Sequence, residues 1–188
     1  DEMKIGILHP RYLGDLILAT PLLRALDRAG HEIVHLAPPS LRNAVPLVPW
    51  GRWRFLAGEP PACIQEEERC DAVLLPATLD GQARWAEEAG IPIRIGRDRP
   101  RARPHLTHAP ALLPGRHEVD WILSLLDPLG IPIAGRQLEI RIPPEADAEA
   151  RARVRAIDLD PGGFTHLCPF GARRWTEWPN KSWRSLAS

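Results

Sequence analysis

Two short apolar runs with one helical segment between them constrain the fold of this chain most strongly. The first run, residues 4–9, is rich in isoleucine and ends at Pro10, and the second covers residues 32–37. Leucine and alanine recur at intervals of three and four residues between about 14 and 30, which predicts a helix that Gly30 ends. A strand, a helix and a second strand form a β-α-β unit, so we expect a parallel sheet with right-handed crossovers.

Pro21 lies inside the predicted helix of residues 14–30. Proline removes a backbone donor and clashes with the preceding turn of a helix. The sequence therefore predicts either a kink near Ile17 or a short first piece followed by a longer one.

The alternation of strand and helix signals continues along the chain. Strands are predicted at 71–75 and 91–96, and helices at about 81–89, 117–126 and 144–157. This order is typical of an α/β domain, so the fold class that we expect is a Rossmann-like parallel sheet with helices on both faces.

Residues 158–163, Asp-Leu-Asp-Pro-Gly-Gly, are the best linker candidate in the chain. After it, the sequence predicts a new strand at 164–168, then a loop through Gly171, and then a helix that begins at Pro179. The expected division is one complete domain over 1–157, followed over 158–188 by the linker and the first β-loop-α of a second Rossmann-like domain. The roughly 25 residues of that second domain are too few to enclose a core.

Composition excludes several other classes of protein. The chain has 188 residues, 24 basic and 24 acidic side chains, and three cysteines without metal-ligand spacing. Its apolar runs are far shorter than the roughly 20 residues that span a bilayer. We therefore expect a cytoplasmic protein with no disulfide framework, no metal site and no nucleic-acid partner.

An arginine-rich stretch over residues 94–116 has two interpretations. It holds six arginines and one acidic residue, Asp98. Such a stretch often forms a solvated loop. It could instead form an anion-binding rim, because guanidinium groups pair with phosphate and carboxylate oxygens.

Asp15 follows Gly14 just after the first predicted strand, where open α/β sheets place their ligands. An Asp before an apolar helix is commonly an N-cap. The functional alternative is a general base whose carboxylate is kept ionised by the helix N-terminus, which would lower its pKa.

The segment 169–179 is the second candidate site. Gly171 and Ala172 would allow a ligand to approach the backbone closely, and Arg173 and Arg174 could neutralise a diphosphate. Alternatively, the tryptophans of this segment pack one domain onto the other. Dinucleotide, P-loop and serine-hydrolase motifs are absent from the sequence, and His105, His108 and His117 lack the acidic partners that a metal site would need.

Four stretches of the chain resemble glycosyltransferase family 9, the ADP-heptose:lipopolysaccharide heptosyltransferases. The stretch 13–26, Leu-Gly-Asp-Leu-Ile-Leu-Ala-Thr-Pro-Leu-Leu-Arg-Ala-Leu, lies within 4–26 and is the most similar. The others are residues 71–96, 117–130 and 170–179. Their order and spacing cover nearly the whole chain.

The resemblance implies a two-domain GT-B fold whose first domain binds the acceptor and whose second binds the nucleotide-sugar. It implies a cytoplasmic enzyme of lipopolysaccharide biosynthesis that needs no metal or organic cofactor and transfers a heptose, or a similar sugar, with inversion from an ADP-sugar to an anionic glycolipid. A peripheral contact with the inner membrane surface is compatible with such an acceptor. Asp15 stands where the family places its catalytic base.

The resemblance also assigns two sets of binding residues. Donor diphosphate contacts are expected at Gly171, Ala172, Arg173, Arg174 and Thr176, and acceptor contacts at Arg11, Gly14, Arg97, Arg99, Arg101 and Arg103. Thr176 stands where the family commonly has a Lys, whose charge Arg173, Arg174 or Lys181 would replace.

Length is the other departure from the family. Since a GT-B enzyme needs two complete domains, we expect the 188-residue chain to be a fragment or an incomplete reading frame that is inactive alone. The alternatives are a non-catalytic module that binds anionic glycans, or an inactive fragment of such an enzyme.

Overall fold

The computed structural model describes all residues except 1, 10–11, 59–60, 112–113, 170–176 and 188. The chain divides into two compact units, Asp1–Pro143 and Pro144–Ser188. This boundary falls before the helix of residues 144–155, whereas the division expected from the sequence falls after it.

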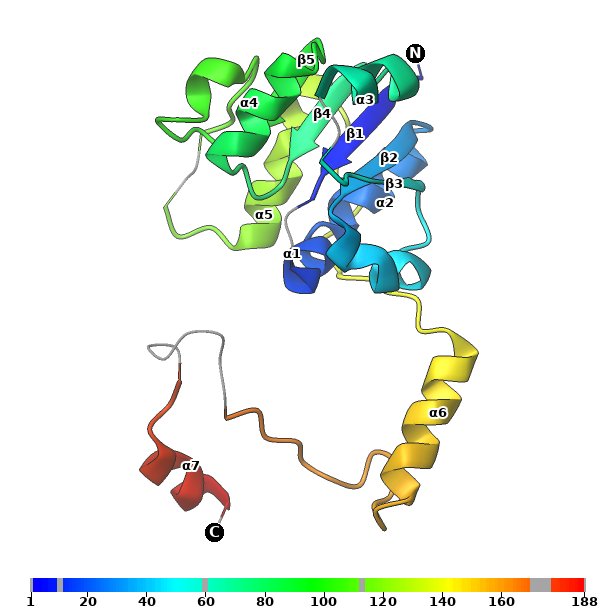
Figure 1. Ribbon diagram of the computed structural model, residues 1–188. Helices are drawn as coiled ribbons and strands as arrows, with labels where there is room; N and C mark the ends of the chain where they lie inside the picture. The colour runs from blue at the N-terminus through cyan, green and yellow to red at the C-terminus, as the bar shows by residue number, and fades with distance from the viewer. Residues whose placement is uncertain (1, 10–11, 59–60, 112–113, 170–176, 188) are drawn as a thin grey trace. The chain divides into compact units, whose positions relative to one another are not determined.

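The first unit is built on one parallel sheet (Figure 1). Its five strands lie in the order β3-β2-β1-β4-β5, and every neighbouring pair is parallel. The strands are β1 Lys4–Leu8, β2 Glu32–Ala37, β3 Arg52–Phe55, β4 Ala72–Leu75 and β5 Ile93–Gly96. The Rossmann-like fold class expected from the sequence is confirmed.

The helices of this unit are α1 Leu13–Leu18, α2 Thr20–Arg28, α3 Pro61–Glu68, α4 Asp80–Glu88 and α5 Glu118–Leu123, with shorter-pitch 3-10 turns at Pro39–Leu47, Arg103–His105 and Ser124–Leu129. The helices predicted at 14–30, 81–89 and 117–126 are present as α1 with α2, α4 and α5, whereas α3 was not predicted. The predicted split before Pro21 is confirmed, because α1 ends at Leu18 and α2 begins at Thr20. The Thr20 hydroxyl donates to the Ile17 carbonyl at 2.7 Å across this break.

Side chains alternate between the two faces of the sheet, as the pleat of a strand requires. Ile5, Ile7 and Leu74 point into a core that α1, α2 and α5 cover. Val73 and Leu75 point into a second core on the other face, which includes buried residues of α3 and α4. Figure 1 shows the helices on both sides of the sheet. Both faces are thus buried, which explains why the strands read as nearly continuous apolar runs.

The order of the strands fixes where a ligand can bind. From β1 the chain moves outward to β2 and β3, and it then returns to the other side of β1 to form β4 and β5. The two crossovers that leave β1 and β4 therefore diverge at the carboxyl ends of these neighbouring strands. Open α/β sheets bind ligands at this topological switch point.

The second unit contains two described helices, α6 Pro144–Arg155 and α7 Asn180–Ala187. The strand predicted at 164–168 is wrong, because these residues are irregular and Phe164 and Leu167 are exposed. A strand needs a neighbour for its hydrogen bonds, and the described part of this unit offers none.

No described helix is long and apolar enough to cross a membrane.

Candidate functional site

The loop after β1 leads into α1, which carries Asp15 in its first turn. Asp15 is the third residue of the helix, and Tyr12 precedes the helix without a side-chain cap. The N-cap interpretation of Asp15 is therefore wrong, because a capping side chain stands before the first turn and not inside it. The carboxylate is half-buried, and no residue of the described ranges donates a hydrogen bond to it.

Two effects raise the pKa of Asp15 above its ordinary value. Burial is the larger, because it disfavours the charged form, and the negative charge of Glu118 adds to it. The expectation that the helix N-terminus would lower this pKa is wrong. Helix α1 has only six residues, so the partial charge at its start is small and does not offset the burial. A raised pKa makes Asp15 a better proton acceptor than an ordinary aspartate.

Thr78 and Arg97 lie where β4 and β5 end. The Thr78 hydroxyl donates to the Leu75 carbonyl at 2.6 Å and accepts from the Arg97 backbone N–H at 2.7 Å. Thr78 is fully buried with φ +45°, a conformation that is uncommon for a residue other than glycine. A Cβ atom at Gly96 would lie 2.9 Å from the Thr78 hydroxyl oxygen, so only glycine fits beside this turn. The turn fixes the backbone of Arg97.

The side chain of Arg97 is held inside the protein rather than offered to solvent. Its guanidinium carbon lies 3.8 Å from the centroid of a Trp121 ring, and its Nη2 donates to the Glu118 carboxylate at 2.6 Å. Only 14% of the side chain is exposed. Glu118 begins α5 and Trp121 lies one turn later, so Arg97 connects the end of β5 to the first turns of α5.

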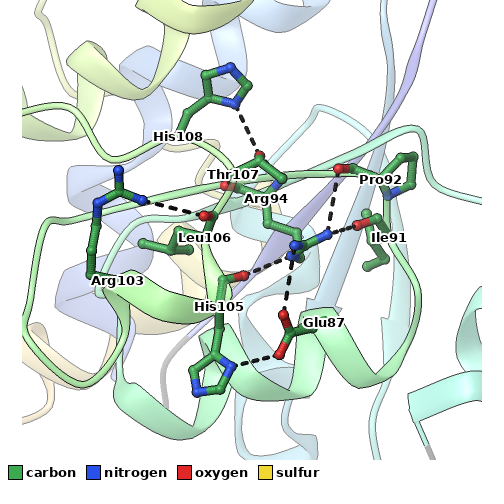
Figure 2. A network of polar contacts seen from close by, with 9 residues as sticks. All are labelled: Glu87, Ile91, Pro92, Arg94, Arg103, His105, Leu106, Thr107 and His108. Atoms are coloured by element: carbon green, nitrogen blue, oxygen red, sulfur yellow. Dashed lines mark hydrogen bonds and ion pairs between the residues drawn. The ribbon is translucent and has the colours of Figure 1, made fainter.

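The Arg94 side chain is also held by hydrogen bonds within the protein (Figure 2). Its Nε donates to the His105 carbonyl at 2.7 Å, and its Nη1 donates to the Ile91 carbonyl at 2.7 Å. Glu87 of α4 accepts from His105 at 2.7 Å and faces Arg94 at 4.0 Å. Since these bonds join β5, α4 and the following loop, Arg94 has a structural role and is not part of a solvent-facing rim.

The other four arginines of the stretch, Arg99, Arg101, Arg103 and Arg116, face solvent to a greater extent. Arg101 and Arg103 are exposed, and Arg99 is half-buried. Arg103 faces Asp98 at 3.9 Å. Arg103 and Arg116 also line a shallow groove of about 610 Å³ together with His108 and Asp127. The structure thus divides the stretch into arginines that hold the fold and arginines that face outward.

The remaining predicted contacts fall in two groups. Gly14 is the second residue of α1, and no atom lies within 4 Å of where its Cβ would stand. The predicted contacts at Arg11, Gly171, Ala172, Arg173, Arg174 and Thr176 lie outside the residues that the structure describes.

The histidines considered as metal ligands are separate from one another in their bonding. His105 contacts Glu87, His108 contacts Thr107, and the His117 ring accepts from the Val119 N–H. Within the described ranges, no group of three or more histidine, cysteine or acidic side chains could hold a metal ion.

Sequence reasoning missed Glu118, Thr78 and Trp121. Glu118 looked like an ordinary acidic residue in the first turn of a helix, and Thr78 stands in a segment to which no element was assigned. Both matter through contacts between distant parts of the chain. The one available signal was position, since Thr78 follows the strand predicted at 71–75 and so lies at the same edge as Asp15.

Several solved structures with a similar fold are glycosyltransferases. A glycosyl transferase family 9 protein from Veillonella parvula DSM 2008 matches with a TM-score of 0.74 and 21% identity, over 100% of this chain and 59% of its own. E. coli ADP-heptose lps heptosyltransferase II matches with a TM-score of 0.69 and 20% identity, over 98% of this chain and 60% of its own. E. coli heptosyltransferase WaaC with ADP matches with a TM-score of 0.63 and 16% identity, over 98% and 63%.

Comparisons of sequence alone add no further relatives. No protein-family model matches the chain, and no curated protein sequence is similar to it. The chain therefore has a Rossmann-like α/β fold that it shares with family 9 glycosyltransferases and ADP-heptose heptosyltransferases, over about three fifths of their length.

Proposed function

We propose that this protein is the acceptor-binding part of an inverting, metal-independent glycosyltransferase, with Asp15 as its general base. One observation carries the proposal: a half-buried carboxylate of raised pKa, to which no described residue donates a hydrogen bond, lies at the switch point of a fold shared with heptosyltransferases. A proton acceptor is what the attack of a sugar hydroxyl on an anomeric carbon requires.

The reaction would be a single displacement. An acceptor hydroxyl oxygen forms a bond to the anomeric carbon of the donor while the bond from that carbon to the diphosphate breaks. The hydroxyl proton passes to Asp15, and the electron pair of the broken bond leaves with the nucleoside diphosphate. Attack on the face opposite the leaving group inverts the anomeric configuration.

The donor that we propose is an ADP-sugar, since two of the similar solved structures are a heptosyltransferase with ADP and one with ADP-2-deoxy-2-fluoro heptose. Negative charge grows on the departing diphosphate, so fixed amides and cations would stabilise it. Gly171, Ala172, Arg173, Arg174 and Thr176 are the residues that we assign to this role on sequence grounds.

The acceptor that we propose is an anionic glycolipid, with a lipopolysaccharide-type acceptor as the leading candidate. Arg99, Arg101 and Arg103 would pair with its phosphate or carboxylate groups. Arg11 and Gly14, which are close to Asp15 in the sequence, are the other acceptor contacts that we propose. Arg97 was also predicted to contact the acceptor. Because its guanidinium already bonds to Glu118, we propose that it positions residues of the site and does not bind the acceptor directly.

The test combines turnover and binding. The chain, and a form that includes any sequence encoded beyond residue 188, are incubated with ADP-heptose and a phosphorylated lipopolysaccharide-core acceptor, and ADP release and the mass of the acceptor are measured. We expect the chain to bind the acceptor more weakly as salt rises, and Arg99→Ala with Arg101→Ala to weaken binding by about twofold to fivefold per arginine.

Arg84→Ala is the matched control, because Arg84 is an exposed arginine of α4 that pairs with Glu88 at 2.8 Å. It should leave acceptor affinity unchanged. Acceptor binding that is indifferent to salt would contradict the arginine rim. Acceptor binding without ADP release in either form would favour a non-catalytic glycan-binding module, and absence of both would contradict the proposal.

A further inference from the structure

Asp15 and Glu118 occupy corresponding places on two helices that pack together. Asp15 lies in the first turn of α1 and Glu118 in the first turn of α5, and the two helices contact each other. The negative charge of Glu118 is felt at Asp15. Two carboxylates near one another at a partly buried edge repel, so the protein must hold the second one in place at a cost.

Arg97 offsets this repulsion with its positive charge, and three contacts fix its position. Its backbone N–H donates to buried Thr78, its guanidinium lies over the Trp121 ring, and its Nη2 donates to Glu118. A planar guanidinium makes the ring contact and the carboxylate bond at the same time, which a lysine ammonium does not do equally well.

We propose that Arg97 and Glu118 form a positioning pair for Asp15, in which Arg97 holds the Glu118 carboxylate in the first turn of α5, the helix that packs against α1. This inference rests on the proposed role of Asp15 as the general base. Neither Arg97 nor Glu118 needs to touch the substrate. The positive charge of Arg97 limits the repulsion between the two carboxylates.

Other charged groups on the elements that pack against α1 are either paired or lie at the far end of α2. On α2, Arg24 bonds to Glu139 at 3.0 Å, and Asp27 and Arg28 lie in the last turn, at the far end of that helix from α1. On α5, Asp120 is paired with Arg136. Glu118 is the charged residue of the described chain whose field raises the pKa of Asp15.

Carboxyl carbon NMR on the 188-residue chain tests the pair without any substrate. The protein is labelled with carbon-13, and the resonance of the Asp15 carboxyl carbon is followed through a pH titration. We expect Glu118→Gln to move the midpoint of Asp15 to lower pH, because a neutral amide replaces the neighbouring negative charge. Glu118 is 43% exposed, so this variant should fold. An unchanged midpoint in Glu118→Gln would overturn the proposal.

Arg97 variants test the second half of the inference. In Arg97→Met, Glu118 loses its cation, so the midpoint of Asp15 should move to higher pH, and Arg97→Lys should produce a smaller rise. In the double variant Arg97→Met with Glu118→Gln, the midpoint should match that of Glu118→Gln alone, because Arg97 acts through Glu118. If a folded Arg97→Met or Arg97→Lys protein keeps the wild-type midpoint, Arg97 has no positioning role.

Glu88→Gln is the matched control, since it also removes one half of an Arg–Glu pair, on α4. It should leave the midpoint of Asp15 unchanged. In a form that turns over, the acid limb of the kcat/KM profile should follow the same shifts in the variants. Because the titration needs no substrate, coupled midpoints with no transfer activity would contradict the proposed function alone, and transfer activity with uncoupled midpoints would contradict the positioning pair alone.

Discussion

Asp15→Asn is expected to lower the rate of sugar transfer by about 100-fold to 10,000-fold, the usual contribution of a general base. Asparagine keeps the shape of the side chain but cannot accept the proton of the acceptor hydroxyl. Since Asp15 is half-buried and receives no hydrogen bond from any described residue, the substitution should leave the fold intact. The measurement is single-turnover heptose transfer in whichever form of the protein is active.

Asp27→Asn provides the matched control for that experiment. Asp27 is an exposed aspartate in the last turn of α2. Its substitution should leave the rate within about twofold of wild type. A near-normal rate in a well-folded Asp15→Asn protein would remove Asp15 from the chemistry.

The second large effect is a loss of stability in mild acid that comes from two buried histidines. His9 Nε2 lies 2.8 Å from His35 Nδ1, and His35 Nε2 lies 2.7 Å from the Trp50 carbonyl. Since that carbonyl can only accept, a neutral His35 carries its proton on Nε2, and His9 donates to its bare Nδ1. His35 also stacks on Trp53, with ring centroids 4.3 Å apart. A further proton on either buried ring would place a positive charge in the interior, which burial disfavours.

Burial lowers the pKa of both histidines. The pKa of His35 falls from 6.5 to about 4, and that of His9 lies well below its ordinary value, with the charge of His35 adding to the effect of burial. Unfolding therefore takes up protons below pH 6.5, so the stability that these neutral rings provide is complete above that pH and is lost as the pH falls toward 4. For His35 alone the loss is about 3 kcal/mol.

Urea unfolding, followed by tryptophan fluorescence at a series of pH values, measures this effect. We expect the free energy of unfolding to fall steeply between pH 6.5 and about 5, where most carboxylates are still ionised. A His9→Gln, His35→Gln double variant should be less stable at neutral pH but should lose most of this slope. His166→Gln, at an exposed position, should keep it. An unchanged slope in the double variant would contradict the account of the buried pair.

The sequence predicted those elements that carry a strong periodic signal. The run before Pro10, the break before Pro21 and the strand at 32–37 all appear in the structure as β1, the α1–α2 break and β2. Each depends on local chemistry, either the regular spacing of apolar side chains or the missing N–H of proline, and such signals survive in a single sequence.

Elements whose formation depends on distant partners were missed or wrongly predicted. Strand β3 alternates charged with aromatic residues, and Arg52 and Arg54 are engaged by glutamates of α3, so no apolar run marks it. Residues 164–168 have a strand-like composition but no described neighbour with which to pair. Composition alone cannot supply the partner that a strand requires.

The candidate site was predicted in the same partial way. Asp15 could be found because it follows the first strand of a β-α-β unit, where ligands of such sheets bind. The residues around it could not be predicted. Glu118 affects Asp15, and Thr78 bonds to Arg97, only because the folded sheet and helices bring distant parts of the chain together. The direction of the pKa shift was wrong for that reason, because the effect of burial and of Glu118 cannot be read from the first turn of α1.

Direct contact between the acceptor and Asp15 is the central claim, and the carboxyl resonance of Asp15 tests it most directly. A phosphorylated core oligosaccharide is titrated into the carbon-13-labelled chain. The account predicts a saturable shift of the Asp15 carboxyl resonance, with the same affinity that the backbone resonances around residues 99–103 report. Saturable binding that leaves the Asp15 resonance unmoved would contradict it.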